Sequence, residues 1–170
     1  MSCTAHTPIL ESRVLDWPDE TACAAFARQL AALPALWPST FIALDGPLGA
    51  GKTSFVRHLL RALGVQGPIK SPTYAVLEPH ALPAAAGALP RTVAHFDFFR
   101  FADPREWEEA GFREVFGAPG LKLAEWPGNA APLLPAPDWQ MELGVGEGDQ
   151  RHVTVHVLTP HGRQLLALMP

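Results

Sequence analysis

Gly46-Pro47-Leu48-Gly49-Ala50-Gly51-Lys52-Thr53 is the stretch that decides the fold, because it fits the phosphate-binding pattern G-x-x-x-x-G-K-[ST] at every fixed position. The apolar run 41–44, which has the length of a β-strand, leads directly into it. The segment 54–63 follows with apolar residues on one helical face. A strand, a glycine loop and a helix in this order favour a P-loop over a chance glycine turn.

The residue types in this loop suit the phosphates of a nucleotide. Glycines let the backbone curl so that several N–H groups point inward as an anion-binding nest, and the helix that follows adds its N-terminal amides. Lys52 supplies a mobile cation for the outer phosphates, and the hydroxyl of Thr53 is placed to bind Mg²⁺. The loop therefore predicts a nucleotide and Mg²⁺ as ligands.

The composition is that of a globular protein. The chain has 170 residues, of which 48% are hydrophobic and 18% charged, so we expect one domain over 1–170. A net charge of −4 argues against a freestanding nucleic-acid binder. No signal segment and no stretch able to span a membrane is recognisable, so we expect a cytoplasmic protein without a membrane partner.

The remaining sequence predicts an α/β domain. Residues 1–7 are expected to be a loose terminus and the Pro/Ala/Gly segment 79–91 a mobile, exposed loop. The expected helices cover 19–33, 54–63 and 103–110, and the expected strands cover 9–15, 41–44, 74–78, 92–99, 121–126, 139–145, 151–158 and 163–168. We therefore predict a P-loop NTPase-like fold with one mixed sheet, parallel around the P-loop, with antiparallel C-terminal strands at an edge and helices covering it.

Two acids stand at the ends of predicted strands, where ligands bind in open α/β sheets. Asp97 follows the run 93–96, and Glu125 follows the run 121–124. Either acid could complete the Mg²⁺ shell with Thr53, and the other could position the attacking water. The alternative for each is a strand-end charge that faces solvent.

Three further side chains are candidates. Ser71 and Thr73, in Lys70-Ser71-Pro72-Thr73, offer hydroxyls for a switch that senses the outer phosphate, but the residues alone slightly favour a rigid proline turn. Trp126 either stacks on a base or a partner, or belongs to the core, which is the commoner place for a tryptophan.

The class of P-loop protein can be narrowed by elimination. The guanine-binding motifs D-x-x-G and N-K-x-D do not occur in the sequence, so a GTPase has no support. The long segment 79–91 contains a single arginine, Arg91, whereas the lid of a small-molecule kinase usually carries several. An ATPase that serves a larger complex needs neither a guanine-binding motif nor a lid over a second substrate, and this interpretation is favoured.

The sequence resembles the TsaE (YjeE) family, the ATPase subunit of bacterial tRNA threonylcarbamoyladenosine synthesis. The resemblance covers roughly 16–135 and is weak in the tail. It rests on motifs that occur in order and with close spacing: the P-loop, Lys70-Ser71-Pro72-Thr73-Tyr74, His95-Phe96-Asp97 with Arg100, Asp103-Pro104, Gly111 and Glu125-Trp126-Pro127.

The resemblance implies a set of site residues. The implied catalytic residues are Lys52, Asp97 and Glu125, and the implied metal ligands are Thr53 and Glu125. The implied nucleotide-binding residues are Thr21, which resembles a threonine near the base, Gly46, Pro47, Leu48, Gly49, Ala50, Gly51, Lys52, Thr53, Ser54, Ser71, Thr73 and Trp126. Ser71-Pro72-Thr73 matches the switch-like loop of the family, and Trp126 matches a functional tryptophan.

The resemblance also implies a Mg²⁺-dependent ATPase with low activity alone. Hydrolysis would drive or reset the TsaB–TsaD complex, which modifies adenosine 37 of tRNAs that read ANN codons, so tRNA is an indirect partner. Departures from the family are Ser54 in place of a common threonine, Phe98-Phe99 in place of Leu-Tyr, and a longer segment near 82–90. A phosphotransferase for a small metabolite and a nucleotide-gated binding module without meaningful hydrolysis remain the alternatives.

Overall fold

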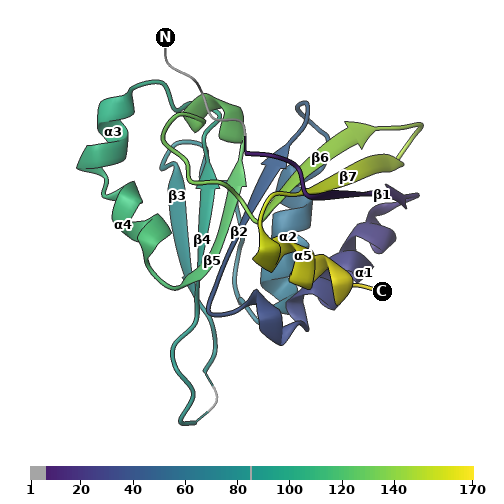
Figure 1. Ribbon diagram of the computed structural model, residues 1–170, viewed down its shortest axis with the longest axis horizontal. Coiled ribbons are helices and arrows are strands. Elements are labelled where there is room, and N and C mark those ends of the chain that lie inside the picture. Colours follow the sequence, from purple (N-terminus) through teal and green to yellow (C-terminus); the bar gives the residue numbers. More distant parts are fainter. Residues whose placement is uncertain (1–6, 85) are drawn as a thin grey trace.

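A computed structural model describes residues 7–84 and 86–170 and shows one sheet with helices on both faces (Figure 1). The sheet has seven strands in the order β1-β7-β6-β2-β5-β4-β3. The strands are β1 (Glu11–Trp17), β2 (Ser39–Asp45), β3 (Leu77–Ala81), β4 (Thr92–Asp97), β5 (Gly120–Glu125), β6 (Trp139–Val145) and β7 (Arg151–Val157). The α-helices are α1 (Glu20–Ala31), α2 (Lys52–Ala62), α3 (Pro104–Glu109), α4 (Phe112–Gly117) and α5 (Pro160–Ala167), with 3-10 helices η1 (Pro34–Leu36) and η2 (Pro127–Ala130). Apart from Thr7, the expected loose terminus lies outside the described residues.

The strand pairing confirms a mixed sheet. β2 lies between β5 and β6 and is parallel to both, and β4 is parallel to β5. Antiparallel pairing occurs at the two edges, where β7 joins β6 to β1 and β3 pairs with β4. The C-terminal strand β6 therefore extends the parallel part, and the antiparallel pairs begin one strand further out.

Alternating residues of the central strands face two separate cores. In β2, Ile42 and Leu44 belong to the core beneath α1, α2 and α5, whereas Phe41 and Ala43 belong to the core beneath α3, α4 and η2. Fully burying each large apolar side chain contributes roughly 1.5–3 kcal/mol, so both layers are held firmly on the sheet. The first layer fixes α2, whose N-terminus carries the glycine loop.

The helix starts follow the sequence signals. The Asp19 side chain accepts a hydrogen bond from the Ala22 amide at 3.0 Å, and the Asp103 side chain accepts one from the Arg105 amide at 2.9 Å. Pro104 occupies the first turn of α3, as the capping pattern predicts. None of the helices traced over 7–84 and 86–170 has the length and apolarity that crossing a bilayer requires.

The predicted strand 163–168 is wrong, because residues 163–167 lie in helix α5 and Leu168 caps its end. Thr159 caps the helix by accepting a hydrogen bond from the Gly162 amide at 2.9 Å, and Pro160 occupies the first turn. Pro160-His161-Gly162 is therefore the beginning of the helix, and not a connection between two strands. Leu165 and Leu166 are buried against the α1–α2 core, so tertiary packing and capping together select the helix.

Two further elements differ from expectation. The strand predicted at 74–78 begins at Leu77 and continues to Ala81, because Val76 has a left-handed backbone with φ of 66° that interrupts an earlier start. The first three residues of the segment 79–91 accordingly pair with β4. Helix α4 was not predicted, although Phe112 and Phe116 have helical spacing and pack on the sheet.

We predict that Gly162→Ala destabilises the protein although alanine normally favours a helix. A Cβ at this position would collide with the backbone carbonyl group of Asp138, 2.9 Å from its carbon atom and closer still to its oxygen. Overpacking of this kind costs about 1–3 kcal/mol, which should lower the melting temperature by several degrees in a thermal unfolding experiment.

Gly117→Ala in α4 is the matched control, because a Cβ there would meet no atom within 4 Å. This change should leave the melting temperature unchanged or raise it slightly. Equal melting temperatures for the two variants would contradict the close packing of α5 on Asp138.

Candidate functional site

The glycine loop lies between the end of β2 and the start of α2. Gly46 has φ of 140°, and a side chain there would collide with the backbone carbonyl of Leu143 in β6, so only glycine fits. Gly51, with φ of 99°, forms the left-handed step directly before the first residue of α2. The Asp45 carboxylate accepts a hydrogen bond from the Gly46 amide at 2.8 Å, which anchors the start of the loop.

Lys52 is buried inside the loop, with 4% of its surface exposed. Its ammonium donates hydrogen bonds to the carbonyls of Gly46 at 2.6 Å and Pro47 at 2.9 Å. It also lies 3.9 Å from the centre of the Trp126 ring, within the range of a cation–π contact. Burial lowers the pKa of the Lys52 ammonium, against the opposing effect of nearby carboxylates. The Lys52 ammonium therefore lies against the backbone of the glycine loop, where the phosphates are expected to bind.

Glu125 meets the start of α2 at the carboxyl end of β5. It stands opposite Leu44 of β2 and Asp97 of β4 in the parallel register, so both acids reach the same end of the sheet. Oε2 of Glu125 accepts a hydrogen bond from the Thr53 hydroxyl at 2.8 Å. Oε1 accepts one from Nε2 of His95, also at 2.8 Å. The two residues predicted to bind metal are therefore in direct contact.

Asp97 holds the segment that contains Ser71 and Thr73. One of its oxygens, Oδ2, accepts hydrogen bonds from the hydroxyls of Ser71 and, at 3.0 Å, Thr73. The other, Oδ1, accepts one from the Phe99 amide at 3.0 Å. The Asp97 amide in turn donates to the Val76 carbonyl at 2.8 Å. The sequence separates these groups, and the fold brings them together around one carboxylate.

Trp126 lies at the site and also packs on the core. It follows Glu125 directly, and its backbone is left-handed with φ of 55°. The Trp126 amide donates to the Leu44 carbonyl at 3.2 Å, and its ring lies 5.1 Å from the ring of Phe99. The half-buried indole thus forms one wall of the site beside Lys52.

A cavity of about 440 Å³ gathers most of the predicted residues. The predicted residues that line it are Leu48, Gly49, Ala50, Gly51, Lys52, Thr53, Ser54, Ser71, Thr73, Asp97, Glu125 and Trp126. Gly46 and Pro47 do not line it, but their carbonyls accept hydrogen bonds from Lys52. Thr21 is exposed on α1 and neither lines this cavity nor contacts Lys52.

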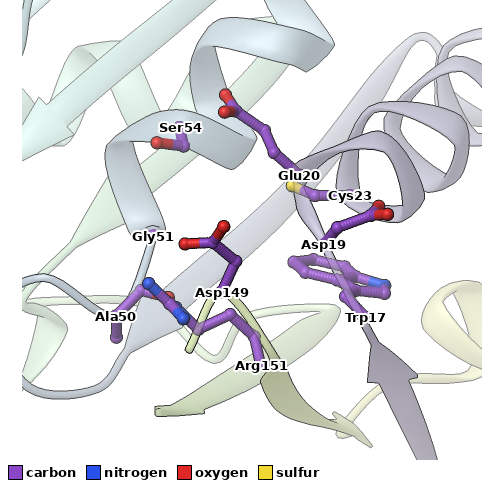
Figure 2. A pocket seen from close by; sticks show the side chains of 9 residues that line it. All are labelled: Trp17, Asp19, Glu20, Cys23, Ala50, Gly51, Ser54, Asp149 and Arg151. Carbon is purple, nitrogen blue, oxygen red and sulfur yellow. The ribbon is translucent and has the colours of Figure 1, made fainter. Parts of the chain in front are cut away.

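A second cavity of about 160 Å³ adjoins the first (Figure 2). It is lined by Trp17, Asp19, Glu20, Cys23, Ala50, Gly51, Ser54, Asp149 and Arg151, of which Ala50, Gly51, Ser54 and Arg151 also line the larger cavity. Figure 2 shows Asp149 and Arg151 across the cavity from the residues at the start of α1. Burial, and then the charge of Glu20, raises the pKa of the Cys23 thiol to about 12, so Cys23 is an uncharged wall and not a nucleophile.

Arg151 and His95 contact residues of this site but have no role in the sequence-based prediction. Arg151, at the start of β7, donates from Nε to the Ala50 carbonyl at 3.1 Å and from Nη2 to the Gly49 carbonyl at 3.3 Å. His95 in β4 donates to Glu125. Period-two alternation with Asp97 places His95 on the face of the acids, so a signal for it existed. The position of Arg151 depends on long-range strand pairing and has no local signal.

The fold and the site together define a P-loop nucleotide-binding protein. A parallel strand ends in a glycine loop, a helix begins with Lys52 and Thr53, and carboxylates stand at the ends of the two neighbouring strands β5 and β4. The hydroxyl of Thr53 and the carboxylate of Glu125 converge beside the loop, as this class requires.

Comparisons with known proteins give the family. The model of the family described as threonylcarbamoyl adenosine biosynthesis protein TsaE matches residues 17–153. A tRNA threonylcarbamoyladenosine biosynthesis protein TsaE from Haemophilus influenzae is 31% identical over 161 residues, covering 93% of this chain and 98% of that protein. One from Bacillus subtilis is 32% identical over 137 residues, covering 81% of this chain and 79% of that protein. The chain belongs to the TsaE family.

The fold is shared with a solved structure. The crystal structure of Bacillus subtilis YdiB superimposes with a TM-score of 0.73 at 22% sequence identity and covers 94% of each chain. This similarity extends into the C-terminal part, where the family motifs of the sequence are weak.

We predict that Asp97→Ala loosens the segment 70–76. The carboxylate accepts hydrogen bonds from two hydroxyls and one amide, and a hydrogen bond to a charged group contributes about 1.5–3 kcal/mol. Hydrogen exchange followed by mass spectrometry should show amides of 70–76 and Phe99 exchanging on the order of tenfold faster.

Asp103→Ala is the control, because it removes a carboxylate that lies beyond the end of β4 and accepts hydrogen bonds from Arg105 at the start of α3. It should leave exchange in 70–76 unchanged. Equal exchange of this segment in the wild-type and Asp97→Ala proteins would show that Asp97 does not hold it.

Proposed function

We propose that this protein binds ATP with Mg²⁺ at the P-loop and hydrolyses it to drive or reset a TsaB–TsaD complex that modifies adenosine 37 of tRNAs reading ANN codons. The observation that carries the proposal is the contact between Thr53 and Glu125 beside the buried Lys52, all lining one cavity. Family membership supports the tRNA modification pathway, because the relatives are named for threonylcarbamoyladenosine biosynthesis.

The two adjoining cavities suit the two ends of a nucleotide. Phosphates would lie in the larger one against the amides of the loop and the N-terminus of α2, and Lys52 would exchange its carbonyl partners for phosphate oxygens. The base would lie in the smaller one between Trp17 and the hairpin that carries Asp149. Thr21 follows Glu20, a lining residue of that cavity, and its role near the base rests on the family resemblance alone.

The residues beside the loop fit Mg²⁺. This cation prefers hard oxygen ligands, and a hydroxyl and a carboxylate converge here within 2.8 Å. Glu125 is only 2% exposed, so a cation would complement its buried charge. Thr53 and Glu125 would hold the ion, directly or through water, and the bound ion would neutralise charge on the phosphate oxygens.

Asp97 is suited to act on the other side of the site. It lines the same cavity as Glu125 and holds the hydroxyls of Ser71 and Thr73. We propose that Asp97 couples this segment to the outer phosphate and orients the attacking water, while Glu125 serves the metal. Trp126 would cover Lys52 and limit access of solvent to the reacting phosphate.

The rim of the site supports docking of a protein partner. Leu48, a lining residue of the cavity, is 80% exposed, and Phe99 is 45% exposed. Tyr74, which follows the Ser71–Thr73 segment, is 84% exposed. Large apolar side chains gathered around a cavity are typical of an interaction surface. The net charge of −4 is consistent with tRNA being held by the partners, and we place the protein in the cytoplasm with them.

We predict that Lys52→Ala weakens ATP binding on the order of a hundredfold or more, because the only cation buried in the loop is removed from the phosphates. Isothermal titration calorimetry with ATP and Mg²⁺ measures this directly. Arg113→Ala, an exposed basic residue on α4, is the control and should bind ATP like the wild type. Undiminished binding by Lys52→Ala would refute the P-loop assignment.

We predict that Glu125→Gln lowers Mg²⁺-dependent ATP turnover by about 10²-fold or more while metal-free nucleotide binding changes little, since the amide is a poor metal ligand. Turnover is measured as phosphate release with and without purified TsaB–TsaD and tRNA. Wild-type protein should be slow alone and faster with its partners.

Turnover stimulated by a metabolite that becomes phosphorylated would favour a phosphotransferase instead. ATP-dependent binding to TsaB–TsaD without any phosphate release would favour a nucleotide-gated module.

A further inference from the structure

His95 is a completely buried histidine whose polar contacts all point to one residue. Its side chain lies on β4 with 0% exposure. Nε2 lies 2.8 Å from Oε1 of Glu125, and Nδ1 is buried with no hydrogen-bond partner among the residues that the structure describes. Because an ionised carboxylate only accepts hydrogen bonds, Nε2 carries the proton and donates it to Glu125.

Packing alone does not account for a histidine at this position. Its neighbours on the same face of the sheet, Val93 and Leu123, are fully buried apolar residues of the core. A buried nitrogen without a partner costs about 1–3 kcal/mol, which an aliphatic side chain here would avoid. The single hydrogen bond to Glu125 is therefore the feature that an aliphatic residue could not supply.

That hydrogen bond sets the orientation of the Glu125 carboxylate. With Oε1 held by His95, Oε2 is directed to the hydroxyl of Thr53. His95 does not line the larger cavity, so it would touch neither the nucleotide nor the metal. In metal sites, a group that hydrogen-bonds to a ligating carboxylate fixes its direction, and losing that group typically lowers metal affinity 10–100-fold.

We propose that His95 is a positioning residue that presets Glu125 for Mg²⁺. The inference rests on the proposed function in one respect, namely that Thr53 and Glu125 hold the ion. The donated Nε2–H keeps the carboxylate in the orientation that faces Thr53, so the two ligands are already aligned when the nucleotide arrives with its metal. Without that donor, the Glu125 side chain can rotate. Fixing it again when Mg²⁺ binds costs conformational entropy, so the affinity for Mg²⁺ falls.

The test compares His95→Gln with His95→Met, two side chains of nearly equal shape of which only glutamine has a terminal N–H donor. Binding of a fluorescent ATP analogue is measured in EDTA and then during a Mg²⁺ titration, so the readout is affinity and not turnover. We expect His95→Met to raise the Mg²⁺ concentration at the midpoint about tenfold while affinity in EDTA changes by less than about twofold. His95→Gln should restore much of the difference.

His80→Leu is the matched control, because His80 on the neighbouring strand β3 also has a buried ring nitrogen, Nε2, that finds no hydrogen-bond partner within residues 7–84 and 86–170. It should leave the Mg²⁺ midpoint unchanged. A thermal melt in EDTA for each variant identifies any loss of folding, and His95→Leu provides a second donor-free variant if His95→Met does not fold.

The outcomes separate the two proposals. A wild-type protein whose nucleotide affinity responds to Mg²⁺, with the same midpoint in the donor-free variants, would overturn the role of His95 and leave the proposed function standing. A wild-type protein that binds the analogue without any response to Mg²⁺ would overturn the metal assignment of Thr53 and Glu125 itself, and the role of His95 with it.

Discussion

The hydrogen bond from Thr53 to Glu125 is the contact on which the site depends. It joins residues that are 72 positions apart, one at the start of α2 and one at the end of β5. Two independent arrangements must be right for it to form: the parallel register that places Glu125 opposite Leu44, and the packing that fixes α2 under the sheet. The aromatic rings of Trp17, Phe26 and Phe55 secure that packing. The geometry of the site therefore depends on the packing of the core beneath it.

Charged groups in this site are kept within a buried region by mutual contacts. Lys52 is surrounded by carbonyls and an aromatic ring, and Glu125 accepts two hydrogen bonds. Burying charges without such partners would cost several kcal/mol, so the network of contacts is a condition for folding as well as for binding. The arrangement also means that a nucleotide would replace existing partners of Lys52 and would not simply fill a space.

Local signals were sufficient for the centre of the site and insufficient for its surroundings. The glycine loop is encoded in consecutive residues, and Asp97 and Glu125 are marked by strand ends, so all three could be predicted from the sequence. Arg151 could not, because its contact with Ala50 spans 101 residues and depends on the order of strands β7, β6 and β2. The strand predicted in place of helix α5 is wrong because a short apolar segment suits a strand equally well, and the helix depends on the Thr159 cap, on Pro160 and on burial of Leu165 and Leu166. Among the described residues, no contact of Thr21 supports the role proposed for it.

The left-handed backbone of Val76 has a consequence for how the Ser71–Thr73 segment responds to its surroundings. A β-branched residue in this conformation is strained by about 1–3 kcal/mol, and the strain persists only while neighbouring contacts maintain it. Those contacts are the Val76 carbonyl bonded to the Asp97 amide and the Val76 amide bonded to the Pro72 carbonyl. The Asp97 amide belongs to β4 and helps to maintain this strain, whereas the Asp97 carboxylate holds the hydroxyls of Ser71 and Thr73. The stretch from Ser71 to Val76 is therefore tied at both ends to one residue of β4, so a movement of β4 at Asp97 would reach both ends together.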